Sequence, residues 1–186
     1  AYRMQMFIEY RCDLDVCNYK KAWEGVISRY PSLRMCFNWD VDLIQIICQE
    51  GVIKFSYDDI SDKSLPEQEH YITNYQKRDK SLEFDLKEPS LFRLHLFKCS
   101  GDRYLLLKNQ HHSISDGWSN PLLLNCLHSY YLRLCSGDSL DVVVDDSYLR
   151  AQKHISRLQV LQNEYWQTKL AGRLDVNDLN PLMSHK

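Results

Sequence analysis

Hydrophobic and polar positions change from a period of two to a helical period within the first thirty residues. Every second residue from Tyr2 to Tyr10 is apolar or aromatic, which predicts a strand. Asp13 or Asp15 then offers an N-cap for a helix whose apolar stripe ends at Pro31. Because this stripe occupies one side of the helix, we expect the helix to pack on a sheet.

Three short β-rich segments follow, over residues 33–39, 43–48 and 52–57. The sequence Asn38-Trp39-Asp40 supplies turn residues between the first two. We therefore expect the three segments to form an antiparallel meander.

The middle of the chain predicts a helix and then a hairpin. The helix is expected over residues 64–80, with Pro66 near its start and with Ile72 and Tyr75 facing inward. Two apolar runs at 91–99 and 104–110, joined by a turn that contains glycine, predict the hairpin.

Two more helices are predicted in the last third of the chain. The first is capped by Ser119 or Asn120, and the second covers about residues 146–170. Residues 173–186 are polar and are expected to be a tail or linker. The predicted fold class is a layered α/β (α+β) lobe with a mixed, largely antiparallel sheet and packed helices.

Composition excludes some classes of binding partner but does not indicate a function. With 44% apolar residues the chain can bury one sizeable core, and its net charge of −2 gives no basic surface for nucleic acid or an anionic membrane. No apolar run could cross a bilayer and no signal peptide is evident, so a cytoplasmic protein is expected. The seven cysteines lack the paired spacing of a zinc site, so we expect buried, reduced thiols and no metal.

The segment His111-His112-Ser113-Ile114-Ser115-Asp116-Gly117 lies between a predicted strand and a predicted helix, where proteins commonly present reactive groups. Adjacent strand residues point to opposite faces, so one histidine is expected to face a substrate and the other to be structural. A buried aspartate needs a cation or several donors, so we expect Asp116 to have a partner, and Gly117 to permit a tight turn. Ser113 and Ser115 lack a Gly-x-Ser-x-Gly elbow, which disfavours a serine nucleophile.

Several stretches together carry a family resemblance. The His-x-x-x-Asp core is that of the superfamily containing chloramphenicol acetyltransferase, and further stretches resemble the condensation domains of non-ribosomal peptide synthetases. These stretches are Arg29-Tyr30-Pro31-Ser32-Leu33-Arg34-Met35-Cys36-Phe37, Phe84-Asp85-Leu86 with Pro89 and Arg93, Asp116-Gly117-Trp118-Ser119, and Glu164-Tyr165-Trp166 with Leu170-Ala171-Gly172.

The resemblance implies an architecture and an activity. Residues 1–172 would form the N-terminal lobe of a condensation domain with the chloramphenicol acetyltransferase-like fold, and 173–186 a tail or the start of a linker to an absent C-terminal lobe. The activity would be amide-bond formation between an aminoacyl or peptidyl thioester and an aminoacyl acceptor. Both would be carried on the 4'-phosphopantetheine of donor and acceptor carrier proteins, with no cofactor bound directly. Neighbouring adenylation domains are further implied partners, and the isolated lobe is expected to be inactive.

The resemblance also implies roles for individual residues. His112 would face the substrate tunnel, as a general base or as a group that positions the amine, while His111 would face the scaffold. Asp116 would form an ion pair with Arg34 rather than act as a second acid. Gly117 would be a turn glycine, or would lend its N–H to an oxyanion.

Two other functions remain open at this point: a stand-alone acyltransferase that uses coenzyme A or a lipid alcohol, and a non-catalytic lobe that docks a carrier protein. Away from the histidine segment, residues 79–87 are expected to be solvated surface, and Trp118 to pack into a core or loop.

Overall fold

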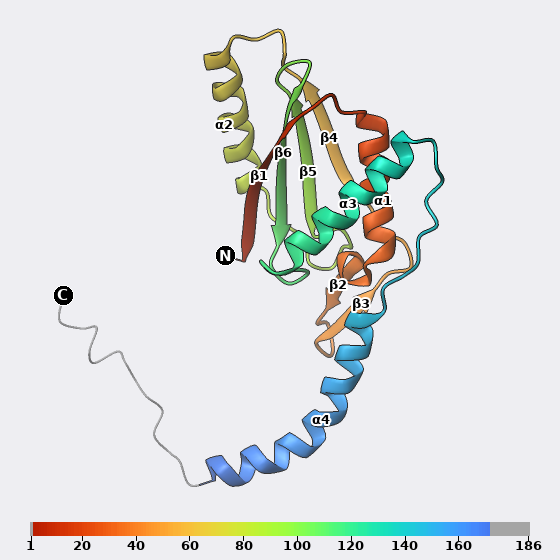
Figure 1. The fold of residues 1–186 in the computed structure, drawn as a ribbon. Coiled ribbons are helices and arrows are strands. Elements are labelled where there is room, and N and C mark those ends of the chain that lie inside the picture. Colours follow the sequence, from red (N-terminus) through yellow and green to blue (C-terminus); the bar gives the residue numbers. More distant parts are fainter. Residues whose placement is uncertain (1, 172–186) are drawn as a thin grey trace, which may run out of the picture. The chain divides into compact units, whose positions relative to one another are not determined.

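Four strands form a mixed sheet at the centre of the fold (Figure 1). In the computed structural model, which describes residues 2–171, the order is β1 (Arg3–Arg11), β6 (Arg103–His111), β5 (Phe92–Lys98) and β4 (Lys54–Asp59). The β1–β6 and β6–β5 pairs are antiparallel, whereas β5 and β4 are parallel. The predicted first strand and the predicted hairpin are confirmed.

The β-rich segments after the first helix do not form one meander. β2 (Met35–Asn38) and β3 (Ile44–Ile47) pair antiparallel in a separate two-stranded sheet, but β4 joins the main sheet. Helix α2 (Leu65–Ser81) lies between β4 and β5 in the chain. A strand, a crossover helix and a second strand of the same sheet give parallel pairing, so the prediction for the third segment was wrong.

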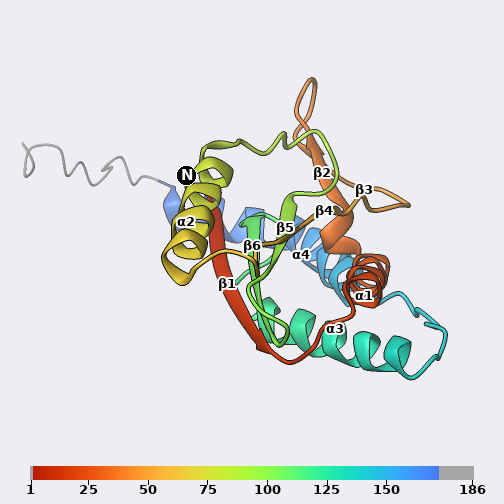
Figure 2. The ribbon, with the colours of Figure 1, turned by 90° about the horizontal axis from the view of Figure 1, so that it is seen from above.

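Helices cover both faces of the main sheet. Seen from above, α2 lies on one side and α1 (Val16–Arg29) and α3 (Ser119–Cys135) lie on the other (Figure 2). As predicted, Asp15 caps α1: its carboxylate accepts the Asn18 N–H at 2.9 Å. The fully buried Trp23 of α1 packs toward the sheet, with its ring centroid 6.2 Å from that of a strand phenylalanine. A short 3-10 turn, η1 (Pro31–Arg34), follows the helix.

The inner side of α2 packs on a small apolar cluster. The cluster consists of Ile60, Phe97, Cys99 and Leu107, with Ile72 and Tyr75 of α2 packed against it. The inward direction predicted for these two helix residues is confirmed. At the start of α2, the Ser64 N–H donates to the Glu67 carboxylate at 2.9 Å, which fixes the first turn.

The cysteines do not follow the expectation of uniform burial. All seven are free thiols. Cys36 and Cys99 are buried, but Cys12, Cys17 and Cys135 are exposed. Burial raises the pKa of Cys36 and of Cys99, so both thiols stay protonated at neutral pH.

The last described element is α4 (Ser147–Leu170), which confirms the predicted last helix and falls in a second unit, residues 147–186. Several large apolar side chains of α4 are exposed, among them Ile155, Tyr165 and Trp166. None of the helices within residues 2–171 has the length and apolar character that a membrane span needs. The tail predicted for residues 173–186 lies outside the described residues.

Candidate functional site

The two histidines stand at the end of β6 and are held there by the backbone. The His111 N–H donates to Leu91 O at 2.8 Å, and the His112 N–H donates to Tyr2 O at 2.7 Å. The start of the loop is thus fixed to the residue before β1 on one side and to the segment before β5 on the other. A site on a rigid sheet end holds its side chains more precisely than a free loop would.

His111 is engaged with its own loop. Its Nδ1 lies 2.8 Å from Ser113 Oγ and accepts the Ser113 N–H at 3.3 Å, so the neutral ring carries its proton on Nε2. The ring also packs edge-on to Phe84, with centroids 6.3 Å apart. Burial, followed by nearby positive charges including that of Arg3, lowers the pKa of His111. These contacts hold the His111 ring against its own loop and Phe84.

His112 is exposed and faces open space. Tyr2, His111, His112 and Ser113 line a hollow of about 520 Å³. Among residues 2–171, no hydrogen bond to the His112 imidazole is recorded, so both ring nitrogens are available to a ligand. Both histidines line the hollow. Because β6 ends at His111, the alternation of side chains along the strand does not extend to His112, and the two rings are separated less than expected.

The expected ion pair between Asp116 and Arg34 is absent from the described part of the chain. Asp116 accepts the N–H and the O–H of Ser119, at 2.8 Å and 2.7 Å. These hydrogen bonds lower the pKa of Asp116. Arg34 is buried, and its Nη1 donates to Cys48 O at 2.9 Å and to Gln49 O. Each charge therefore has other partners: Asp116 holds Ser119, the first residue of α3, and Arg34 ties η1 to the chain after β3. The N-cap position of α3 is Trp118, not Ser119 or Asn120 as predicted.

Gly117 and Trp118 also differ from expectation. Gly117 does not have a positive φ, and a Cβ added there would meet no atom within 4 Å, so the turn itself does not require glycine. Trp118 is 87% exposed instead of packed. The loop after the histidines therefore leaves room around its backbone and presents an aromatic ring to the outside.

A buried lysine that the sequence analysis did not single out closes the base of this loop. Lys108 of β6 is 3% exposed, and its Nζ donates to Asn120 Oδ1 in α3 at 2.9 Å and to Gln110 Oε1. Burial lowers the pKa of Lys108 to about 8. This amine links β6 to the first turn of α3, across the loop that carries His112. Only the lysine's place in an otherwise apolar run could have drawn attention to it.

A buried ion pair anchors the end of α2 beside the site, so solvated surface was the wrong prediction for Asp79. Asp79 is 5% exposed, and Arg93 Nε of β5 donates to its Oδ1 at 2.6 Å. Gln5 of β1 donates to Oδ2 at 3.0 Å, and Asn109 of β6 donates to the same oxygen. Three strands are thereby joined to one helix. An arginine in the apolar run at residues 91–99 was the signal that could have indicated an acidic partner.

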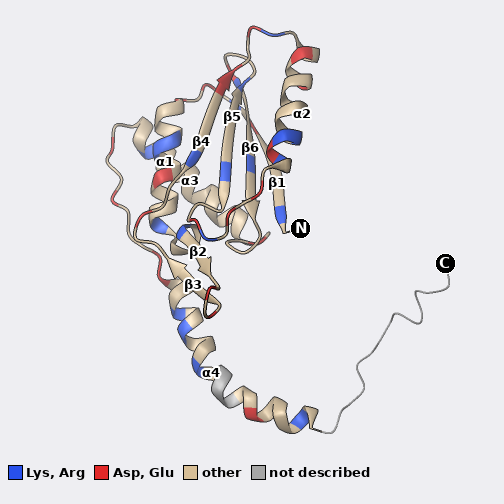
Figure 3. Cartoon of the chain, turned by 180° about the vertical axis from the view of Figure 1, so that it is seen from behind, with Lys and Arg blue, Asp and Glu red and all other residues tan. Residues whose placement is uncertain are grey.

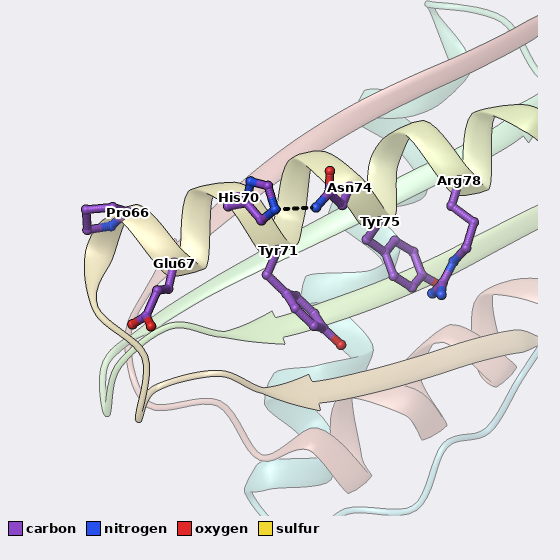
Figure 4. Close-up of a pocket in the computed structure, with 7 residues that line it drawn as sticks. All are labelled: Pro66, Glu67, His70, Tyr71, Asn74, Tyr75 and Arg78. Carbon is purple, nitrogen blue, oxygen red and sulfur yellow. Dashed lines mark hydrogen bonds between the residues drawn. The ribbon is translucent and has the colours of Figure 1, made fainter.

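Two further hollows lie along α2. One, of about 540 Å³, is shown in Figure 4 and is lined by Pro66, Glu67, His70, Tyr71, Asn74, Tyr75 and Arg78. The other, of about 420 Å³, is lined by Arg3, Gln5, Gln76, Lys80 and Asn109. The second hollow shares strand β6 with the histidine hollow, and Arg3 of the second directly follows Tyr2 of the histidine hollow, whereas the first hollow lies on α2 alone.

Comparison with known proteins gives a consistent set of similarities. A family model described as "Condensation domain" matches residues 1–185. The N-(5-amino-5-carboxypentanoyl)-L-cysteinyl-D-valine synthase of Penicillium rubens is 30% identical over 183 residues, which is 96% of this chain and 5% of that protein. The synthase of the same name from Amycolatopsis lactamdurans is 32% identical, over 100% of this chain and 5% of its own length.

Solved structures share the fold. The starter condensation domain of the rhizomide synthetase superposes with a TM-score of 0.76 at 19% identity, over 94% of this chain and 45% of that one. The first condensation domain of the CDA synthetase gives 0.71 at 20% identity, over 92% and 45%. The predicted fold class is thus confirmed. The chain spans about a twentieth of the curated relatives and less than half of these solved domains.

Proposed function

Because this chain belongs to the condensation-domain family, as its motifs predicted, we propose that it supplies the histidine loop of a site that forms amide bonds. The donor is an aminoacyl or peptidyl thioester and the acceptor is the amine of an aminoacyl thioester. Both are carried on 4'-phosphopantetheine arms of carrier proteins. The observation that carries the proposal is the placement of His112: anchored through its backbone, exposed at its ring and beside a hollow of about 520 Å³.

The reaction needs one nucleophilic attack and one proton transfer. The acceptor nitrogen attacks the thioester carbonyl carbon, a C–N bond forms, and the tetrahedral intermediate expels the donor thiolate as the C–S bond breaks. The nitrogen loses a proton and the sulfur gains one. An imidazole can accept the first proton and return it to sulfur, or can hold the amine at the carbonyl by a hydrogen bond. Contact with the acceptor nitrogen is assigned to His112, and a pH–rate profile would distinguish the two roles.

The other residues of the segment act by holding the loop that positions the His112 ring. His111 holds the loop through Ser113, and Asp116 fixes the start of α3 through Ser119. Arg34 supports the chain after β3 and does not reach the loop. Gly117 leaves space for the reacting groups to approach.

The proposed partners are the donor and acceptor carrier proteins, a complementary C-terminal lobe and neighbouring adenylation domains. The lengths of the similar proteins support this proposal. The solved condensation domains are more than twice as long as the part that this chain matches, and the curated synthases are about twenty times as long. A second lobe would supply the opposite wall for the tethered substrates, which a reaction dependent on orientation needs.

The test compares two neighbouring histidines in the complete domain. We expect His112→Ala to abolish formation of the dipeptidyl carrier protein, measured by mass spectrometry with loaded carriers, while the fold is retained. His111→Ala is the matched control, and we expect it mainly to lower the melting temperature. Product at the wild-type rate from the His112→Ala variant would remove this residue from the reaction. Turnover of free coenzyme A thioesters without carriers would favour a stand-alone acyltransferase, and loaded carriers that bind without reacting would favour a docking lobe.

A further inference from the structure

We propose that the hollow lined by Arg3, Gln5, Gln76, Lys80 and Asn109 is a subsite for a carboxylate borne by the acyl group that reacts at His112. This inference rests on the proposed function and adds a substrate class to it. The five lining residues define what we call the cationic hollow.

The cationic hollow and the histidine hollow are neighbours on the same strands. Across β1 and β6, Arg3 is paired with His111 and Gln5 with Asn109. The two pairs are two residues apart, so their side chains share a face of the sheet and lie about 7 Å from each other along the strand. The strand pairing places His111 on this face, and His112 lines the same 520 Å³ hollow as His111. An acyl chain whose carbonyl lies in that hollow can therefore reach the cationic hollow with a short side chain.

The charges in the cationic hollow favour an anion. Arg3 and Lys80 are its charged lining residues, and none of the five is acidic. Figure 3 shows the basic residues on the start of β1 and on the last turns of α2. The nearby Asp79 does not cancel them, because its carboxylate is 6% exposed and is already paired with Arg93 at 2.6 Å. The surplus positive charge therefore faces the space itself.

The charged donors of the cationic hollow are largely unused. One guanidinium nitrogen of Arg3, Nη1, donates to Leu82 O at 2.7 Å, which holds the side chain against the end of α2. Its other nitrogens have no recorded hydrogen bond within residues 2–171. Lys80 is exposed and has no carboxylate partner in the same range. Arg3 is thus oriented by the fold yet retains N–H groups for a ligand, and a guanidinium is well suited to bind a carboxylate by two hydrogen bonds.

The floor of the cationic hollow is also polar. Asn109 is 1% exposed, and its Nδ2 donates to Asp79, which fixes the orientation of the amide. Gln5 Nε2 donates to Asp79 and to Gln76 O. An apolar side chain entering this space would cover the Arg3 guanidinium and the Lys80 amine without replacing their water contacts, which costs free energy. The lining therefore disfavours neutral aliphatic acyl groups as well.

Binding to this chain can be measured without turnover, because every lining residue lies in residues 1–146. The probes are the glutaryl thioester of N-acetylcysteamine, which ends in a carboxylate, and the same thioester with a terminal primary amide. We expect the acid to bind at least about fivefold tighter than the amide at low ionic strength, by titration calorimetry or NMR, with the preference falling in high salt. Equal Kd values for the two probes in the folded wild-type chain would overturn the proposal.

Three variants test whether the carboxylate of the acid probe binds in the cationic hollow. Lys80→Gln and Arg3→Gln should each reduce the preference for the acid, whereas Lys77→Gln, another exposed lysine of α2 that does not line the hollow, should retain it. Loss of the preference in Lys77→Gln alone would place the anion elsewhere and overturn the assignment.

The His112→Ala variant distinguishes a failure of this inference from a failure of the proposed function. The variant should keep the preference for the acid while losing turnover in the complete domain. If the complete His112→Ala domain still forms product, the proposed function fails and the subsite stands. If the wild-type domain turns over but the chain shows no preference for the acid, the subsite fails and the function stands.

Discussion

Replacing Lys108 by methionine should remove a pH dependence from the free energy of unfolding between pH 7 and pH 9. The amine is 3% exposed and has two neutral amide acceptors, and no carboxylate partner is recorded for it among residues 2–171. Burial without a counter-charge disfavours the protonated form. Methionine has a similar length and carries no charge, so it removes the titration while filling most of the space.

The size of the effect follows from the pKa difference between the folded and unfolded chain. Burial lowers the pKa of Lys108 from 10.5 to about 8. Between these values the unfolded chain binds more protons than the folded chain, so the contribution of this residue to stability rises with pH. From pH 7 to pH 9 the wild type should gain about 1.3 kcal/mol relative to Lys108→Met, and most of the rise lies above pH 8.

The measurement is a pair of urea unfolding series followed by circular dichroism, in reductant, at half-unit steps of pH. Other groups, including tyrosines whose pKa burial raises, titrate in both proteins and cancel in the difference. At pH 7 the free energies of unfolding of the two proteins should lie closer together than at pH 9. At pH 7 the methionine removes the cost of a buried charge, but it leaves two amide oxygens without a donor, at about 1–3 kcal/mol each.

A difference between wild type and variant that stays flat from pH 7 to pH 9 would refute the reasoning. It would mean that the amine keeps its proton in the folded chain, so that burial does not set its pKa. An anionic partner that raised the pKa above 10.5 would give the same flat difference, because the folded and unfolded chains would then both hold the proton from pH 7 to pH 9.

Three further outcomes follow from contacts at the same end of the fold. Asp79→Ala should destabilise the chain by about 3–5 kcal/mol, because it removes the buried carboxylate that accepts from Arg93, Gln5 and Asn109, and the double variant with Arg93→Met should lose less than the two single losses combined. Arg34→Ala and Asp116→Ala should be additive in a double-mutant cycle of melting, since the two side chains have separate partners, and a coupling above about 0.5 kcal/mol would restore the ion pair. Gly51→Ala should lower the melting temperature, because its Cβ would lie 2.8 Å from Arg34 Cγ and closer still to a side chain of α1; an unchanged melting temperature would show that this contact relaxes freely.

Local patterns were sufficient for most of the elements. The apolar stripe ending at Pro31 and the inward Ile72 and Tyr75 reflect short-range periodicity, and the structure places these helices as expected. The partner of β4 depends on the crossover through α2, which is a property of the order of the elements. Considering that helix together with its flanking strands would have predicted the parallel pairing.

The charged contacts were harder to predict because no local periodicity indicates which charged side chains meet. Asp79 and Arg93 meet only when α2 folds back on β5, and the acid stands in a charge-rich stretch that resembles ordinary surface. The pairing expected of Arg34 failed because backbone carbonyl oxygens of Cys48 and Gln49 accept its hydrogen bonds instead. The histidines were predictable from their motif, but the exposure of His112 and the link from Lys108 to α3 depend on where β6 ends.

The empty space at Gly117 affects how variants of this loop would be scored. A methyl group there meets no atom within 4 Å, and the backbone does not need a left-handed conformation, so folding places no constraint on the position. A library selected for solubility or heat resistance would therefore accept almost any small residue at 117. Only a library selected for product would reveal whether glycine is required, because the substrate is then present to occupy that space.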